Sequence, residues 1–181
     1  MMTFIPLITK RRSIRRYKNR KIEPEKIDML VEAGLRAPSS RGINPWAFIV
    51  VADKALLEKI SKAKPHGAAF LADAALGIVI CADTDKSDVW VEDASIASIF
   101  IHLAAAALNL GSCWIQIRER MHAENKTAGA YLAEVLEIPS HLTVESIVAI
   151  GYPDEDKPPH SKEELQYPKV HWNLYGKTYG N

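Results

Sequence analysis

Residues Ala74–Ala82 read AALGIVICA, a continuous apolar run that includes three β-branched residues. A run of this length without polar alternation is typical of a strand that is buried on both faces of a sheet. Such a strand requires other elements to cover both of its sides. The stretch therefore predicts a sheet at the centre of the domain, with helices on either side.

The segments before and after this run alternate between helical and extended patterns. In Glu25–Arg36 the apolar side chains follow a period of 3.6 residues, and Pro24 and Pro38 mark the two ends. Asp53 is placed to cap the helix that follows it. The expected helices are Thr3–Arg11, Glu25–Arg36, Lys54–Lys62, Val91–Leu110 and Thr127–Leu136, and the other expected strands are Trp46–Ala52, Ser112–Ile117 and Val144–Gly151. This order of elements indicates an α/β or α+β domain.

Two segments indicate contacts beyond one compact domain. The expected helix Val91–Leu110 is apolar almost all round, which is typical of a helix in a core or in a subunit interface. Ser98, His102 and Asn109 interrupt its apolar run, which argues against a membrane span. The C-terminal tail has little periodicity and carries aromatic side chains at Tyr152, Tyr167, Trp172, Tyr175 and Tyr179. We expect this tail to lie on another surface, such as that of a second subunit.

The chain has 181 residues, of which 48% are hydrophobic and 25% are charged. This size and composition predict one soluble globular domain, residues 1–181. Cys81 and Cys113 form no C-x-x-C motif, which indicates a reducing compartment. The first residues do not follow the order of a signal peptide, so we expect a cytoplasmic protein.

The positive charge is concentrated in one segment near the N-terminus. Lys10–Lys21 contains eight basic residues and no acidic residue, although the whole chain has 23 basic and 22 acidic residues. This segment could be a solvated surface, a nucleic-acid patch or a site for a small phosphorylated ligand. The acidic balance of the remaining chain and the absence of recognised nucleic-acid motifs argue against nucleic-acid binding.

Three segments are candidates for ligand binding, namely Arg11–Arg15 (RRSIR), Ala37–Trp46 (APSSRGINPW) and Leu110–Gln116 (LGSCWIQ). Guanidinium and hydroxyl groups suit a phosphate, although the first segment could equally be a run of solvated arginines. The second could equally be an ordinary connection between a helix and a strand. None of the six histidines shows metal-ligand spacing, and nothing marks Cys113 as a nucleophile. We therefore expect no metal site and no catalytic side chain.

These segments in this order resemble the FMN-dependent nitroreductase family. The resemblance is carried by RRSIRRY (Arg11–Tyr17), APSSRGINPWAF (Ala37–Phe48), LGSCWIQI (Leu110–Ile117) and VAIGYP (Val148–Pro153), and it extends from about Leu7 to Tyr175. It implies an α+β three-layer sandwich with a mixed sheet flanked by helices. It also implies an intertwined homodimer whose extended C-terminal tails embrace the partner, with FMN at the subunit interface.

The resemblance also implies which residues bind FMN. Arg11, Arg12, Ser13 and Arg15 match the first FMN-binding motif, and Arg15 is expected to reach the N1–C2=O edge of the ring. Pro38, Ser39, Ser40 and Asn44 match the loop that approaches the flavin from the other subunit. Trp114, Ile115, Gln116 and Ile117 match the strand end behind the ring, where the backbone N–H of Gln116 should face N5. His160 and Lys162 match a cationic pair at the phosphate.

The implied function is that of an FMN-dependent oxidoreductase. NAD(P)H would deliver hydride to flavin N5, and a small nitroaromatic, quinone or flavin would accept it in a ping-pong cycle. The alternatives are reductive dehalogenation or flavin reduction for a partner on the same scaffold, a flavin-binding protein without turnover, and a nucleic-acid-binding protein. Gly42, Asn44, His160 and Lys162 depart from common family residues, so we expect ring-edge and phosphate contacts to differ. The short segment between Phe70 and Val91 predicts an open site.

Overall fold

The computed structural model describes residues 4–180 and centres on a four-stranded sheet. The strand order is β1 (Trp46–Val51), β2 (Leu76–Asp83), β6 (Leu142–Gly151) and β3 (Gly111–Gln116), and neighbouring strands pair antiparallel. Ser13 adds a parallel bridge to Ser112 beside β3, so the pairing is mixed. Every residue of β2 is buried, which confirms the two-sided burial predicted from its sequence.

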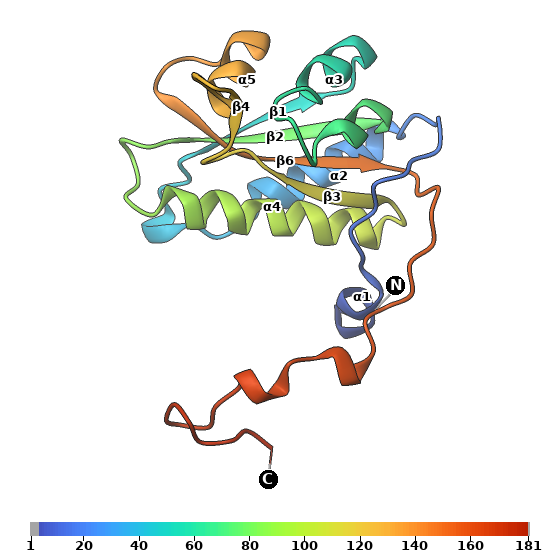
Figure 1. The fold of residues 1–181 in the computed structure, drawn as a ribbon, viewed down its shortest axis with the longest axis vertical. Coiled ribbons are helices and arrows are strands. Elements are labelled where there is room, and N and C mark those ends of the chain that lie inside the picture. Colours follow the sequence, from blue (N-terminus) through green and yellow to red (C-terminus); the bar gives the residue numbers. More distant parts are fainter. Residues whose placement is uncertain (1–3, 181) are drawn as a thin grey trace.

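Helices cover both faces of the sheet and make a three-layer α+β sandwich (Figure 1). Helices α2 (Pro24–Leu35) and α4 (Trp90–Ala107) pack on one face, where Leu30 and Ile101 are fully buried. Helices α3 (Lys54–Ile60) and α5 (Ala128–Leu136) pack on the other, together with a 3-10 turn at Ala69–Asp73. This architecture confirms the expected fold class.

Local capping chemistry accounts for several boundaries. The Asp53 side chain accepts a hydrogen bond from the Leu56 amide at the start of α3, and the Thr127 hydroxyl accepts one from the Ala130 amide at the start of α5. Pro24 lies at the first position of α2, where a missing N–H costs nothing. Helix α1 (Phe4–Lys10) also forms as expected, but Thr3, its expected cap, lies outside the described residues.

Helix α4 is the one helix in residues 4–180 whose length and composition would suit a membrane span. Its side chains Ala94, Ala97, Ile101 and Ala105 are fully buried against the sheet and α2, as in a core helix. On its other side Ile99 and Phe100 are partly exposed. The helix therefore lies in the core, one of the two positions that its all-round apolar sequence indicated, and it also carries an apolar outer face.

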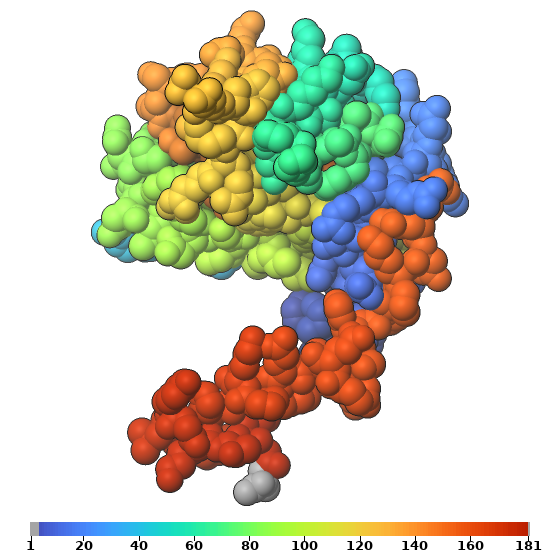
Figure 2. Space-filling view, in the orientation of Figure 1, coloured from blue at the N-terminus to red at the C-terminus, as the bar shows by residue number. Residues whose placement is uncertain are grey.

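The C-terminal tail leaves the domain after β6 and runs alongside α1 and away from the body (Figures 1 and 2). Among its described residues, up to 180, it contains the 3-10 turns Lys162–Glu164 and Tyr167–Lys169 and two isolated bridges, Pro153 with Tyr17 and His171 with Thr178. Trp172 and Tyr175 are 59% and 93% exposed, so these large side chains have little cover from their own chain. This exposure agrees with the expectation that the tail packs on another surface.

Candidate functional site

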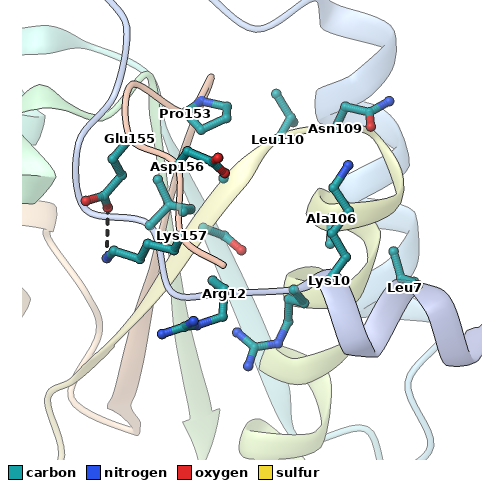
Figure 3. A pocket seen from close by; sticks show the side chains of 14 residues that line it. Leu7, Lys10, Arg12, Ala106, Asn109, Leu110, Pro153, Glu155, Asp156 and Lys157 are labelled. Carbon is teal, nitrogen blue, oxygen red and sulfur yellow. Dashed lines mark ion pairs between the residues drawn. The ribbon is translucent and has the colours of Figure 1, made fainter. Parts of the chain in front are cut away.

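A pocket of about 300 Å³ lies where the C-terminal end of α4 meets the N-terminal segment (Figure 3). Three separate stretches of the chain contribute to it, at residues 7–14, 106–112 and 153–157. Its residues are Leu7, Lys10, Arg11, Arg12, Ile14, Ala106, Asn109, Leu110, Gly111, Ser112, Pro153, Glu155, Asp156 and Lys157. The pocket therefore has an apolar floor and a rim on which four basic residues outnumber the acidic Glu155 and Asp156, and this basic rim suits a ligand with an anionic end.

The basic rim joins two ends of the chain. The Lys157 ammonium donates to the Ser13 carbonyl at 2.8 Å and pairs with the Glu155 carboxylate at 3.0 Å. The Arg12 guanidinium donates to the Pro158 carbonyl. Lys157 was not among the residues expected from the sequence, because its place depends on a contact across 144 positions of the chain.

Arg15 lies on the same segment but is directed elsewhere. Its backbone N–H donates to the Glu155 carboxylate at 2.6 Å, and its guanidinium lies 5.8 Å from the centre of the Phe70 ring. Arg15 does not line the pocket that Arg11 and Arg12 share. The segment thus presents two cationic positions with different surroundings, one at the pocket and one on the side of Phe70.

The outer edge of β3 offers backbone N–H groups. The Ile117 amide donates to the Glu145 carbonyl in β6, whereas the Ser112 carbonyl faces the other way and accepts from the Ile14 amide. Because backbone groups alternate along a strand, the N–H groups of Trp114 and Gln116 point to the same outer side as Ser112. Among residues 4–180, no strand pairs with β3 on that side beyond the bridge at Ser112.

Successive side chains of β3 and of Ile117 after it alternate between the buried core and a half-buried position. Ile115 and Ile117 are each 1% exposed and belong to the core, so they could meet a ligand only through backbone atoms. Trp114 and Gln116 are half-buried, and the indole N–H donates to the Gln116 amide oxygen at 3.1 Å. The Gln116 amide group in turn donates to the Arg118 carbonyl.

Two glycines allow the N-terminal segment to lie close to the sheet. A Cβ atom on Gly111 would lie 2.7 Å from Ile14 Cγ2, and one on Gly151 would lie 2.8 Å from Tyr17 Cδ1. These distances are shorter than normal carbon contacts, so no larger residue fits without movement. The close approach fixes the position of the segment that carries Arg11, Ser13 and Arg15.

Three buried titratable groups of α4 and the sheet are held uncharged. His102 Nδ1 lies 2.7 Å from the Ser112 hydroxyl, and burial together with the nearby Arg11 charge lowers the pKa of His102 to about 4. Burial raises the pKa of the Cys81 thiol to about 12 and also raises the pKa of the Cys113 thiol. Neither thiol is therefore activated as a nucleophile.

The loop at residues 38–44, which was also expected to bind the flavin, lies at the N-terminal end of α4, whereas the basic pocket lies at the C-terminal end. The backbone N–H of Asn44 donates to the Ser39 hydroxyl at 2.9 Å. The backbone N–H of Ser40 donates at 2.7 Å to the carboxylate of Asp93, which lies in the first turn of α4. Pro38 begins this loop, and Asn44 has a φ of 51°. At 1.5 Å per residue the 18 residues of α4 span about 27 Å. One chain therefore does not bring this loop to the basic pocket.

His160 and Lys162 lie on the exposed tail. The imidazole Nδ1 of His160 is 2.6 Å from the Glu164 carboxylate, and the tail around it passes the Arg12 side chain at Pro158. Neither residue lines the pocket. No group of three or more metal-ligand side chains is present among residues 4–180.

The chain is similar to proteins of one family over most of its length. The nitroreductase family model matches residues 8–66 and 62–152. A relative from Archaeoglobus fulgidus, described as an NADH dehydrogenase/NAD(P)H nitroreductase, is 41% identical over 160 residues, which cover 84% of this chain and 87% of the relative. The structure of an FMN-dependent nitroreductase from Clostridium difficile R20291 is 49% identical and covers 95% of this chain and 100% of its own, with a TM-score of 0.94. A further structure from Parabacteroides distasonis, described as an NADH dehydrogenase/NAD(P)H nitroreductase, is 34% identical with a TM-score of 0.85 and covers 94% of this chain and 98% of its own.

Proposed function

This chain belongs to the nitroreductase family and is an NAD(P)H oxidoreductase that uses FMN, and we propose that it reduces a small nitroaromatic or quinone acceptor by a ping-pong cycle. The observation that carries the proposal is the outer edge of β3, whose free N–H groups at Trp114 and Gln116 continue from a pocket with a basic rim. Such an edge suits a flat ring that carries hydrogen-bond acceptors and a distant phosphate.

The donor groups on this edge fit FMN. A phosphate monoester carries about −1.5 to −2 charges, and the cations of Arg11, Arg12 and Lys157 gather on one rim of the pocket. The Ser13 segment lies between this rim and β3, where it would face the ribityl chain. The N–H of Gln116 would hold ring atom N5. The exposed His160 and Lys162 would reach the phosphate only if the tail shifts or a second chain brings them there.

Each group then has a separate part in the reaction. When bound, FMN supplies hydride transfer chemistry at N5. The Gln116 N–H would orient that atom, and the Arg15 guanidinium would stabilise negative charge at the N1–C2=O edge. Because the thiols of Cys81 and Cys113 are buried and protonated, we assign no nucleophilic side chain. Donor and acceptor would use the same open face in turn.

A homodimer would complete the site. Ser39, Ser40 and Asn44 are separated from the basic pocket by the length of α4, but a two-fold-related copy could bring its own loop to the ring. The partly exposed Phe100 and the aromatic tail supply apolar surface for such a contact. We propose that residues 1–181 form one FMN-binding domain of this dimer in the cytoplasm.

Half-reactions of the FMN-loaded protein test the proposal. Under anaerobic conditions, one equivalent of NADH or NADPH should bleach the flavin absorbance. After the oxidised nucleotide has been removed, 4-nitrobenzoate, 4-nitrobenzamide or a quinone should restore the absorbance. Double-reciprocal plots of the initial rate against acceptor concentration, recorded at several donor concentrations, should give parallel lines. Reduction by NAD(P)H without reoxidation by either acceptor class would contradict the assigned acceptors, and intersecting plots would contradict the ping-pong order.

A further inference from the structure

A buried carboxylate at the start of α4 holds the loop at residues 38–44. Asp93 is 2% exposed, and both of its oxygens accept hydrogen bonds. Oδ1 accepts the backbone N–H of Ser40 at 2.7 Å, and Oδ2 accepts the hydroxyl of Ser87 at 2.9 Å. Ser87 is 1% exposed and lies in the connection between β2 and α4. Because a buried carboxylate requires such donors, these two bonds fix the loop, the connection and the helix relative to one another.

The loop needs this support because its backbone is strained. Arg41 and Asn44 have φ angles of 54° and 51°, in a region that residues with side chains rarely adopt. The Ser39 hydroxyl accepts the Asn44 backbone N–H at 2.9 Å and donates to the Asn44 side-chain oxygen at 2.7 Å, which links the two ends of the loop to each other. The bond from Ser40 to Asp93 then ties this strained loop to the buried start of α4.

A second contact between the loop and the same region lies in solvent. Arg41 pairs with Asp88 at 2.6 Å, but the two side chains are 65% and 79% exposed. An exposed ion pair of this kind contributes little, because water and salt screen both charges. Asp88 is therefore a matched comparison for Asp93, since one carboxylate contacts the loop in solvent and the other contacts it in the protein interior.

We propose that Asp93 is a positioning residue that holds the loop at residues 38–44 in the conformation that binds the flavin ring. The inference rests on the proposed function, in which Ser39, Ser40 and Asn44 reach the ring held by a two-fold-related copy. Asp93 is enclosed and contacts the loop backbone, so it acts on the flavin through the loop and not by contact. The basic pocket lies at the far end of α4, so the phosphate end of FMN should be unaffected by a change at Asp93.

Variants of the two carboxylates test the effect on FMN binding. The FMN-loaded protein is diluted, and the fluorescence of the released flavin gives the dissociation constant. Asp93→Ala should weaken FMN binding about tenfold, because the charge-assisted bond that holds the loop is lost. Asp93→Asn should recover most of the affinity, because its amide oxygen still accepts the Ser40 N–H and its amide group can donate to Ser87. Asp88→Ala should retain the wild-type value, and equal dissociation constants in Asp93→Ala and Asp88→Ala would overturn the proposal.

Riboflavin, which lacks the phosphate, separates the ring contacts from the phosphate contacts. The FMN-loaded protein is equilibrated with increasing riboflavin, and chromatography of the protein-bound flavin gives the ratio of the two dissociation constants. Asp93→Ala should keep the wild-type ratio, because it weakens both flavins alike, whereas Arg11→Ala should move the ratio toward one. A changed ratio in Asp93→Ala would mean that Asp93 supports the phosphate pocket of its own chain, and it would overturn the proposal.

The absorption spectrum of the bound flavin separates positioning from a general loss of stability. With saturating FMN, the flavin band of Asp93→Ala should differ from that of the wild type, because the ring has lost the contacts of the loop, and Asp93→Asn should restore the wild-type band. Weaker binding with an unchanged band would mean that the variant only unfolds more readily, and it would overturn the proposal. If the wild-type protein reduces none of the acceptors but the Asp93 variants behave as expected, the acceptor assignment fails and the positioning role stands.

Discussion

His102 Nδ1 in α4 lies 2.7 Å from the hydroxyl of Ser112 in β3, and the carbonyl of the same serine accepts the Ile14 amide. One residue of the sheet thus connects the buried helix to the segment that carries Arg11 and Arg15. A change at His102 can therefore alter the position of the cationic segment without direct contact with a ligand.

The protein should lose stability in mild acid through His102. Its folded-state pKa of about 4 is below the ordinary value near 6.5, so between these values the unfolded chain binds a proton that the folded chain does not. The contribution of the neutral His102 imidazole to stability is fully present above a pH of about 6.5 and is lost as the pH is lowered toward 4. In His102→Gln, the loss of unfolding free energy between pH 7 and pH 5 should be smaller by about 2 kcal/mol.

Urea unfolding at the two pH values measures this difference. His66→Gln, which replaces an exposed loop histidine, serves as the matched control and should keep the wild-type loss. If His102→Gln is as acid-sensitive as the wild type, another group dominates the acid response.

Gly111→Ala should lower both stability and FMN retention. The new methyl group would lie 2.7 Å from Ile14 Cγ2, so the N-terminal segment must move away from β3. Overpacking of this kind costs about 1–3 kcal/mol. Gly129→Ala in α5 is the control, because nothing lies within 4 Å of its added Cβ, and it should be neutral or slightly stabilising. Thermal melts and the FMN content of the purified protein give the result, and equal behaviour of the two variants would exclude this role for Gly111.

Arg15→Ala should lower the midpoint potential of the bound flavin, whereas Arg11→Ala should mainly release FMN. A phosphate contact stabilises both oxidation states alike, but a cation at the N1–C2=O edge favours the reduced state, in which negative charge develops. The different directions of the two side chains agree with this division. For Arg11→Ala we expect FMN binding to weaken about tenfold to a hundredfold. Redox titration of both variants with saturating FMN is the measurement, and an unchanged potential in Arg15→Ala would move that residue to the phosphate group.

Glu145→Gln should stabilise the protein at neutral and alkaline pH. Burial raises the pKa of this carboxyl, and its Oε2 atom has no hydrogen-bond partner. With a raised folded-state pKa, the contribution to stability is complete below the ordinary carboxyl pKa and is lost as the pH rises. The glutamine cannot ionise, so the free energy of unfolding of the variant should exceed that of the wild type by about 1–3 kcal/mol at pH 8, and the difference should disappear near pH 4.

Melting temperatures across this pH range test the Glu145 prediction. Glu124→Gln, at an exposed position of the turn between β4 (Met121–Ala123) and β5 (Lys126–Thr127), should show no such pH dependence. A destabilised Glu145→Gln at pH 8 would mean that the charged carboxylate is favoured in the folded protein.

Much of the fold could be predicted because its signals are local. The apolar run Ala74–Ala82 and the cap at Asp53 each act within a few residues, and the corresponding elements form where expected. Strands β4 (Met121–Ala123) and β5 (Lys126–Thr127) were not predicted, because three and two residues are too short to show a period. The tail also folds back at His171 and Thr178, a local pairing that its irregular pattern did not indicate.

The candidate site was harder to predict because it depends on distant contacts. The motif Arg11–Arg15 was recognisable, but the approach of Lys157 to Ser13 depends on how the tail leaves β6.

The distance along α4 between the Ser39 loop and the basic pocket has a genetic consequence. In a two-fold dimer each site would take its pocket from one chain and its loop from the other. A chain with a defective pocket and a chain with a defective loop would each be inactive alone. In their mixed dimer one site would collect both defects and the other would receive none, so two null alleles should complement each other to as much as half of the normal activity per dimer.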